Sequence, residues 1–553
     1  MKSLLMTLSN LSDPENIPKR AEQVAEFLVD RYPTLYEKIA RHLHQNYNLL
    51  QPTSMKDRDA LEVAYRITRV LWITSGVSAD MCREINKASI THRVIDELND
   101  LKDSVLAGKS DHFMVLYTRS LLGTLLNVIR RSLANRQPIR DRGTVELLQV
   151  YLQGDVTDKC YALIILAYLV DEKENEKITA VTDNVNFLTS LFQSAVESKN
   201  HKLRTVNFTF NAVELARAIF MFIVYDTAKK IFADQGLLSS TVKLLQRDCN
   251  ESEQVIAASI LWSLAFDYDV RKKILKRKDC VKALKRLRNS PSIQVRKACI
   301  GALWEIIDKD RNLESSPSTA PTGHLMISYQ SEDEELALEL TDGLKVSGYN
   351  VWIDVKEMAI DSSLKLANNA IQEAIKSADA VILCASTSYM CSTKCRSEAE
   401  FSRELEKDII VTTVQSKVLM DGWLGKLAGD NSRIFDLSDT NKLEENLPSL
   451  VEEVGKRGKQ QDTSKIDAVD SLPAPDAPVE SWEKEDVAKW LRKENLGHLI
   501  DKFEKYNGKE LLALLKMLER APSFFYDSMK NDLGIQKTHD IALFTNALEK
   551  LDR

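Results

Sequence analysis

The chain has 553 residues, of which 44% are apolar and 28% charged, with only 18 glycines and a formal net charge of −6. This length exceeds what one hydrophobic core supports and predicts three or four domains, and the scarcity of glycine favours long helices. The small net charge excludes a broad basic surface for nucleic acid or for an anionic membrane. Neither a signal peptide nor a membrane-spanning apolar run is evident, so we expect a cytoplasmic protein without a transmembrane segment.

Eight cysteines are scattered along the chain and do not form the framework of a disulfide-rich protein. Cys391 and Cys395 are the only close pair, and no histidine or second pair lies near enough to complete a tetrahedral metal site. The sequence therefore predicts free thiols and no metal centre.

Two stretches rich in proline, serine and charge, at residues 313–323 and 455–479, cannot bury much apolar area and are interpreted as linkers. They divide the chain into three segments, 1–312, 324–454 and 480–553. We expect each segment to be a separate domain.

The first segment contains an internal repeat near its end. Leu261-Trp262 recurs as Leu303-Trp304, a spacing of 42 residues, and each pair belongs to a long apolar helical pattern. Such a period resembles the armadillo and HEAT families, which are α-helical solenoids. The resemblance implies a concave surface for a regulatory partner, and the residues of the repeat carry no chemistry of their own.

The last segment combines WEKEDVAKWL, DKFEKYNGKELLALL, DLGI and a final helix ending in ALEKL. These motifs, in this order and spacing, resemble the sterile alpha motif (SAM) family, an all-α five-helix bundle. The matching positions are Trp482, Val487, Trp490, Leu491, Phe503, Gly508, Leu511, Leu512, Leu533, Gly534 and Ile535. The resemblance implies one of two roles, head-to-tail self-association or RNA binding. Basic clusters are scarce here, which favours self-association.

The middle segment alternates short apolar strands with helical patterns. The predicted strands are residues 325–329, 349–354, 380–386, 409–414 and 433–437. Ser331 and Glu334 form the pattern of a capping box that opens the first helix. A βα alternation of this kind predicts a parallel sheet with right-handed crossovers, whose ligands bind at the carboxyl ends of the strands.

Glu398 lies one turn into the helix that follows the third strand, at this predicted binding edge. An isolated surface glutamate is usually solvated or paired with a cation, so its position is what makes it a candidate. Trp352, near the end of the second strand, is placed to approach the same edge.

The motifs ISYQSEDE, GYNVWIDV and SxxYxxSxxCxxE resemble the boxes of Toll/interleukin-1 receptor (TIR) domains, which have a flavodoxin-like α/β fold. Together with the other two segments, they resemble the sterile-alpha-and-TIR-motif family of NAD+-consuming enzymes, although a single SAM-like segment here follows the TIR-like one. The resemblance implies that Glu398 is the catalytic carboxylate and that NAD+ is a substrate, with no cofactor.

The substrate-binding residues implied by the resemblance are Tyr329, Trp352, Lys394 and Trp423. Lys394 occupies the place of a family aromatic four residues before the glutamate, whereas Trp352 keeps the aromatic of the second box. Trp423 corresponds to a rim aromatic, with core packing as the alternative interpretation for both tryptophans.

Cleavage of the N-glycosidic bond of NAD+ expels neutral nicotinamide, so one carboxylate that stabilises the developing oxocarbenium ion suffices. We therefore expect an NAD+ glycohydrolase of innate-immune or cell-death signalling, with a linear or cyclic product, activated by SAM and TIR self-association and restrained by the helical half. The alternatives are a non-enzymatic TIR and SAM adaptor that recruits other TIR or SAM proteins, and an RNA-binding scaffold, which the charge balance disfavours.

Overall fold

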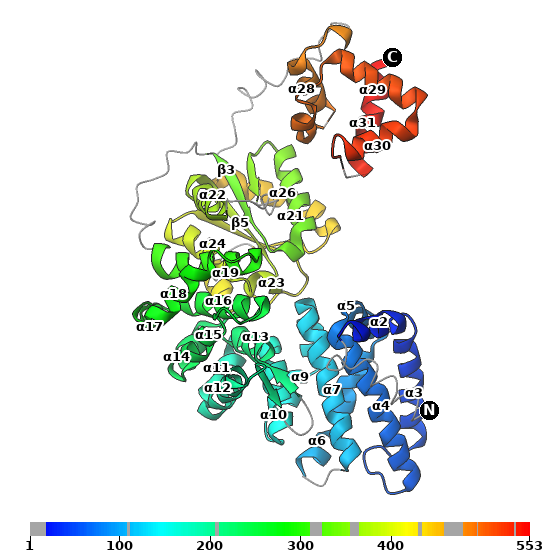
Figure 1. Cartoon of the computed structure of the whole chain (residues 1–553), viewed down its shortest axis with the longest axis vertical. Helices are drawn as coiled ribbons and strands as arrows, with labels where there is room; N and C mark the ends of the chain where they lie inside the picture. The colour runs from blue at the N-terminus through cyan, green and yellow to red at the C-terminus, as the bar shows by residue number, and fades with distance from the viewer. Residues whose placement is uncertain are drawn as a thin grey trace. The chain divides into compact units, whose positions relative to one another are not determined.

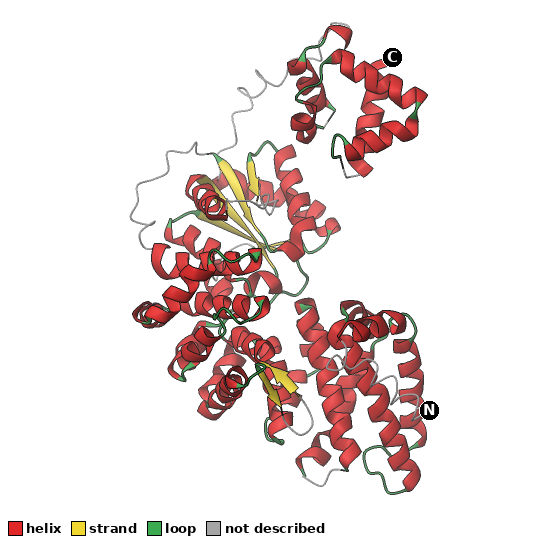
Figure 2. Ribbon diagram, viewed as in Figure 1, coloured by secondary structure: helices red, strands yellow, loops and turns green. Residues whose placement is uncertain are grey.

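The computed structural model describes residues 18–107, 111–204, 209–309, 323–353, 364–429, 434–457, 479–494, 496–535 and 538–552. The chain divides into two compact units, Met1–Lys459 and Gln460–Arg553. Helices dominate, and the strands form one small and one larger sheet (Figure 2), the larger between residues 324 and 436. Within the described segments, no helix has both the length and the apolar character needed to cross a bilayer.

The first part of the larger unit is built from helices. They are α2 (Pro18–Leu28), α3 (Tyr32–Asn46), α4 (Met55–Val77), α5 (Ala79–Lys87), α6 (Ile90–Leu106), α7 (His112–Arg131), η1 (Leu133–Asn135), α8 (Arg136–Arg140), α9 (Thr144–Tyr151), α10 (Val156–Leu169), α11 (Glu172–Ala180) and α12 (Thr182–Glu197). A two-stranded antiparallel hairpin, β1 (Lys202–Arg204) with β2 (Thr209–Asn211), follows them and was not predicted from the sequence.

Three-helix repeats follow the hairpin, as the internal repeat predicted (Figure 1). Their helices are α13 (Ala212–Phe222), α14 (Asp226–Asp234) and α15 (Leu237–Lys243), then α16 (Glu251–Ala265), α17 (Tyr268–Lys276) and α18 (Lys278–Leu287), then α19 (Ile293–Leu303) with the π-helical turn η2 (Trp304–Asp308). Trp262 packs so closely on α19 that a Cβ at Gly301 would lie 2.1 Å from its ring. The repeated tryptophan and the glycine thus set the spacing of neighbouring repeats.

The described residues 323–353, 364–429 and 434–457 form a five-stranded parallel sheet with helices on both faces. The strands are β3 (His324–Ser328), β4 (Val351–Ile353), β5 (Ala378–Ala385), β6 (Asp408–Thr413) and β7 (Phe435–Asp436), in the order β4-β3-β5-β6-β7. All four pairings are parallel, with Ile327 opposite both Ile353 and Ile382. The predicted parallel sheet is confirmed, strand by strand.

The sheet is the middle layer of three. One face packs against α22 (Leu364–Ser377), α24 (Thr393–Glu404) and α25 (Gly422–Ala428), and the other against α21 (Glu334–Val346) and α26 (Thr440–Arg457). On β5, Val381 and Leu383 point to the first face while Ala380 and Ile382 point to the second. Both faces of this central strand are buried, which explains its continuous apolar run.

The predicted capping box at Ser331 and Glu334 is wrong. Residues Ser331–Asp333 form a short 3-10 turn, and α21 begins at Glu334 with no side-chain cap. Asp333 instead accepts a hydrogen bond from Ser386 Oγ at 2.6 Å, and burial raises the pKa of its carboxyl to about 6. The Asp333 side chain therefore bonds to the loop after β5, and a local motif does not reveal this long-range contact.

The smaller unit is a helical bundle. Its segments are η4 (Val479–Ser481), α28 (Lys484–Lys493), η5 (Gly497–Phe503), α29 (Gly508–Arg520), α30 (Pro522–Asn531), α31 (Thr538–Glu549) and η6 (Lys550–Asp552). Trp490 and Phe503 pack against Phe544 in its core, with the two phenylalanine rings stacked at 4.7 Å. A Cβ at Gly508 would lie 1.6 Å from the Val479 carbonyl oxygen, so only glycine fits there.

Candidate functional site

The strand order creates a candidate binding edge between β3 and β5. After β3 the chain adds β4 on one side and then returns to place β5 on the other. In such sheets the connections after these two strands diverge, and the crevice between them is where ligands bind. Ser328 is the last residue of β3, and the short helix α23 (Thr387–Met390) follows β5 at the same edge.

Glu398 reaches this edge from α24. Ser392 caps the helix by accepting a hydrogen bond from the Cys395 backbone N–H at 3.3 Å, and Glu398 follows one turn later. Its side chain is only 8% exposed, and Ser328 Oγ donates a hydrogen bond to its Oε2 at 2.6 Å. The predicted carboxylate is thus held at the carboxyl end of β3.

A second hydroxyl extends this arrangement. Tyr389 of α23 is fully buried, and its hydroxyl lies 2.9 Å from Ser328 Oγ. Burial, with a contribution from the nearby carboxylate of Glu398, raises the pKa of Tyr389 well above its ordinary value. The phenol therefore keeps its proton and donates it to Ser328, whose own proton goes to the carboxylate, because an ionised carboxylate only accepts.

Lys394 lies beside the carboxylate, one helical turn before it. Its Nζ is 3.7 Å from Glu398 Oε1, and its side chain is 45% exposed, so it stands on the solvent side of the site. Residues four apart share a face of the helix, which places both groups at the same edge.

The predicted aromatic residues occupy different surroundings. Tyr329 follows β3 and is partly buried, and its carbonyl oxygen accepts a weak hydrogen bond from Cys395 Sγ at 3.6 Å. Trp352 of β4 is partly buried on the sheet face that α24 covers. Trp423 is 4% exposed, and its indole N–H donates to the Met390 carbonyl oxygen at 2.9 Å. In this conformation Trp423 is a packing residue and offers no open ring face to a ligand.

The opposite side of α24 rests on the helical half. Arg396 is 5% exposed and donates hydrogen bonds to the Val224 carbonyl oxygen at 3.2 Å and to Asp226 Oδ1 at 2.7 Å. Its guanidinium lies 4.3 Å from the centroid of the Phe266 ring, and it also pairs with Glu400 on its own helix at 2.7 Å. One arginine therefore connects α24 to both α14 and the end of α16.

Ser397, the neighbour of the candidate glutamate, is the second connection. Its hydroxyl oxygen accepts a hydrogen bond from the Trp262 indole N–H at 2.9 Å. The hydroxyl proton then goes to Glu305 Oε2 at 3.0 Å. Burial raises the pKa of Glu305, which is 1% exposed and lies in the π-helical turn η2.

Lys309 closes the same contact. Its ammonium lies 2.9 Å from Glu305, 3.6 Å from Glu400 and 3.0 Å from Glu404, so it bridges carboxylates of both parts. Beside this cluster the rings of Trp304 and Phe401 meet edge to face, with centroids 5.2 Å apart. We call Asp226, Trp262, Phe266, Trp304, Glu305 and Lys309, with their partners on α24, the α24 contact.

A separate contact involves the loop before α25. Asp421 Oδ2 accepts hydrogen bonds from the Glu172 backbone N–H at 2.9 Å and from the Tyr225 hydroxyl at 3.2 Å. It therefore supplements the capping of α11 from outside the helical half. Exposed ion pairs of Lys426 with Glu172 at 2.7 Å and Lys417 with Asp141 at 3.0 Å flank it.

Sequence reasoning missed Ser328, Tyr389 and the residues of the α24 contact. The motifs around Ser328 and Tyr389 were recognised, but their side chains meet only because β3 and β5 are neighbours. Nothing in the sequence distinguishes Arg396 and Ser397 from the other polar residues of an amphipathic helix. The predicted thiols Cys391 and Cys395 are free, and among the described residues the only group of three metal-ligating side chains lies in the helical half.

Comparison with known proteins identifies the sheet domain. Residues 325–451 match the family model described as TIR domain, so the chain contains a TIR domain. No curated protein matches the chain.

The similar solved structures include designed and engineered proteins. One designed armadillo repeat protein is 16% identical over 50% of this chain and 100% of that chain, with a TM-score of 0.33. A second engineered protein is 20% identical over 55% of this chain and 64% of that chain, with a TM-score of 0.35.

Proposed function

We propose that the protein is an NAD+ glycohydrolase whose TIR domain is held inactive by the helical half. The observation that carries the proposal is that α24 contacts two different parts of the structure. One side of this helix bears Glu398 at the binding edge of the sheet, and the next residues back, Arg396 and Ser397, are buried against the helical half. A helix anchored on one face in this way cannot rearrange freely on the other.

The proposed chemistry needs the carboxylate of Glu398 and a bound dinucleotide. As the bond between nicotinamide and the ribose breaks, the electron pair leaves with neutral nicotinamide, and positive charge develops on the ribose. The carboxylate stabilises this oxocarbenium ion, and water then adds to give ADP-ribose and a proton. Attack by an adenine nitrogen of the same molecule in place of water would give the cyclic product.

Ser328 is proposed as a positioning residue. Its hydrogen bond to Oε2 orients the carboxylate and leaves Oε1 on the side of Lys394. With a side chain only 8% exposed, Glu398 requires an opening of the edge before a ribose can approach it. This requirement agrees with a restrained state.

The composition of the α24 contact suits a reversible restraint. Buried ion pairs cost desolvation and add little net stability, but they demand their correct partners. A contact built from Arg396, Asp226, Glu305 and Lys309 is therefore specific and can be released by a modest electrostatic change. An entirely apolar contact of the same size would resemble a permanent core.

A test can separate catalysis from restraint in the full chain. Asp226→Lys places a cation against Arg396 without changing the TIR domain, and the Asp226 side chain is 38% exposed, which favours folding of the variant. The matched control is Asp183→Lys, at another first-turn aspartate, which is exposed on α12. Each protein is incubated with NAD+, and nicotinamide, ADP-ribose and cyclic ADP-ribose are separated by chromatography.

Asp226→Lys is expected to release nicotinamide faster than the unmodified chain and the control, and adding Glu398→Gln should abolish release. Release that persists with Glu398→Gln would refute the catalytic role. Equal rates in Asp226→Lys and the unmodified chain would refute restraint by the helical half but would not contradict the proposed NAD+ glycohydrolase activity. If no protein releases nicotinamide, the adaptor interpretation is favoured.

We further propose that the bundle at 479–552 activates the enzyme by self-association. The support is its resemblance to SAM domains, whose heterologous contacts form rings or filaments. The rate of nicotinamide release per chain in Asp226→Lys should then rise with protein concentration. A rate per chain that is independent of concentration would contradict activation by assembly.

A further inference from the structure

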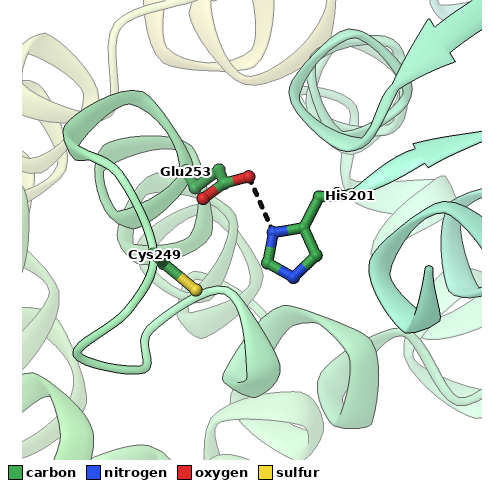
Figure 3. A group of neighbouring side chains, drawn as sticks. All are labelled: His201, Cys249 and Glu253. Carbon is green, nitrogen blue, oxygen red and sulfur yellow. Dashed lines mark hydrogen bonds and ion pairs between the residues drawn. The ribbon is translucent and has the colours of Figure 1, made fainter. Parts of the chain in front are cut away.

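A group of three side chains in the helical half has the chemistry of a metal site. His201 lies in the turn before β1, Cys249 in the loop before α16, and Glu253 in the first turn of α16 (Figure 3). Their ligand atoms all lie within 4.8 Å of one another, and His201 Nδ1 is 2.8 Å from Glu253 Oε1. The sulfur points toward the space that the imidazole and the carboxylate share (Figure 3).

We propose that His201, Cys249 and Glu253 bind one Zn2+ ion. A thiolate, an imidazole and a carboxylate are the ligands that zinc takes, whereas Mg2+ and Ca2+ prefer oxygen ligands alone. Three protein ligands leave the fourth tetrahedral position to water. Binding replaces the thiol proton of Cys249, which is released to solvent.

The geometry needs only a small adjustment. Bonds of about 2.0–2.3 Å in a tetrahedron place ligand atoms about 3.3–3.8 Å apart. The longer separations, at most 4.8 Å, would shorten and the 2.8 Å distance between His201 Nδ1 and Glu253 Oε1 would lengthen, each by side-chain movements of about 1 Å. Cys249 and the Glu253 side chain are each 8% exposed, and the His201 side chain is 25% exposed, so the ion and a bound water would be reached from the side of the imidazole.

The surrounding residues hold the three groups in place. Glu253 Oε2 accepts the Asn250 backbone N–H at 2.9 Å, which leaves Oε1 directed at the imidazole. Gln254 Nε2 donates to the Cys249 carbonyl oxygen at 3.2 Å and thereby fixes the loop. His201 adopts a left-handed backbone conformation with φ of 49°, and its carbonyl oxygen accepts the Ala212 N–H at 2.8 Å. Such outer partners orient metal ligands and are costly to remove.

The ion would fasten two elements that no covalent bond joins. It would tie the turn after α12 to the beginning of α16, across the 47 residues that lie between His201 and Cys249. The same helix carries Trp262, whose indole contacts Ser397 of the TIR domain. A metal at the start of α16 would therefore stabilise the support of the α24 contact.

The test is a titration of the chelator-treated full chain with Co2+, followed by displacement with Zn2+. Co2+ bound to a thiolate gives a charge-transfer band in the near ultraviolet, and we expect one equivalent to saturate it. Cys249→Ser should lose the band, and His201→Ala and Glu253→Gln should weaken binding by more than about tenfold. Controls are Glu251→Gln on the same helical turn and Cys391→Ser, which changes a partly exposed cysteine outside the cluster.

A second measurement uses only the unmodified chain, so its result does not depend on whether the variants fold. Zn2+ should slow the alkylation of Cys249 by iodoacetamide in the unmodified chain but leave Cys391 unchanged, as mapped on peptides. The proposal is overturned if the unmodified chain shows no saturable band, if the band survives Cys249→Ser, or if Zn2+ leaves the alkylation of Cys249 unchanged. In that event the cluster is only a hydrogen-bonded tie between His201 and Glu253.

Discussion

Replacing Arg396 with alanine is expected to release α24 from the helical half. The change removes two hydrogen bonds across the contact, to Val224 and Asp226, and the ring contact with Phe266. Breaking a buried pair by deleting one partner costs about 3–5 kcal/mol, and a partly buried cation–π contact adds about 1 kcal/mol. Because the Asp226 side chain is 38% exposed and keeps Lys229 as a partner, we discount the sum to about 3 kcal/mol.

A loss of about 3 kcal/mol corresponds to a shift of roughly 150-fold in the docking equilibrium. Amide hydrogen exchange of the full chain, followed by mass spectrometry, measures this shift as lost protection in peptides from α24 and α16. The matched control is Arg403→Ala, an exposed arginine on the same helix, which should change protection by less than about 0.5 kcal/mol.

A double-mutant cycle with Asp226→Ala isolates the pair itself. If Arg396 and Asp226 interact as their distance indicates, the coupling free energy should exceed about 1 kcal/mol. Protection of α24 that is unchanged in Arg396→Ala, or effects of the two substitutions that simply add, would refute the reasoning.

Three further predictions concern the site and its support. In the Asp226→Lys background, Ser328→Ala should lower kcat for nicotinamide release by about tenfold with little change in KM, because the 2.6 Å hydrogen bond that orients Glu398 is lost. Burial, with a contribution from the nearby arginine of α24, lowers the pKa of Lys229 to about 7. When α24 separates from the helical half, Arg396 moves away and the pKa of Lys229 rises. Lys229 therefore takes up a proton on separation, so a lower pH favours the separated state. The equilibrium for docking of α24 should weaken by up to about tenfold from pH 8 to pH 6, as measured by amide exchange. Gly301→Ala should lower the free energy of unfolding by about 2–3 kcal/mol in thermal denaturation, because its Cβ would meet the Trp262 ring at 2.1 Å.

Specific outcomes would contradict each of these. An unchanged kcat in Ser328→Ala would remove its positioning role. The pH dependence should vanish in Lys229→Met, so its persistence there would assign it to another group. Unaltered thermal stability of Gly301→Ala would mean that α19 and α16 can separate without cost.

The sequence was sufficient for the elements of the TIR domain, because its apolar periodicity is strong and local. Five short apolar runs became five parallel strands, and the run at 380–386 was buried on both faces, as a central strand requires. The position of Glu398 at the carboxyl edge followed from the βα alternation alone. The repeat of Leu-Trp pairs likewise predicted the helical repeats; Trp262 packs against the next repeat at Gly301, whereas Trp304 packs against Phe401 of α24.

Only the tertiary structure decided what surrounds Glu398. Ser328 and Tyr389 meet because β5 pairs with β3, a strand order that the alternation of elements leaves open. The residues that hold α24 on the helical half lie more than 90 positions apart in sequence, as Glu305 and Ser397 do, and no local pattern connects them. The prediction of a capping box was wrong for the same reason, because Asp333 accepts a hydrogen bond from Ser386 in the loop after β5. Backbone periodicity is set by neighbours along the chain, whereas buried polar side chains take the partners that packing of distant segments supplies.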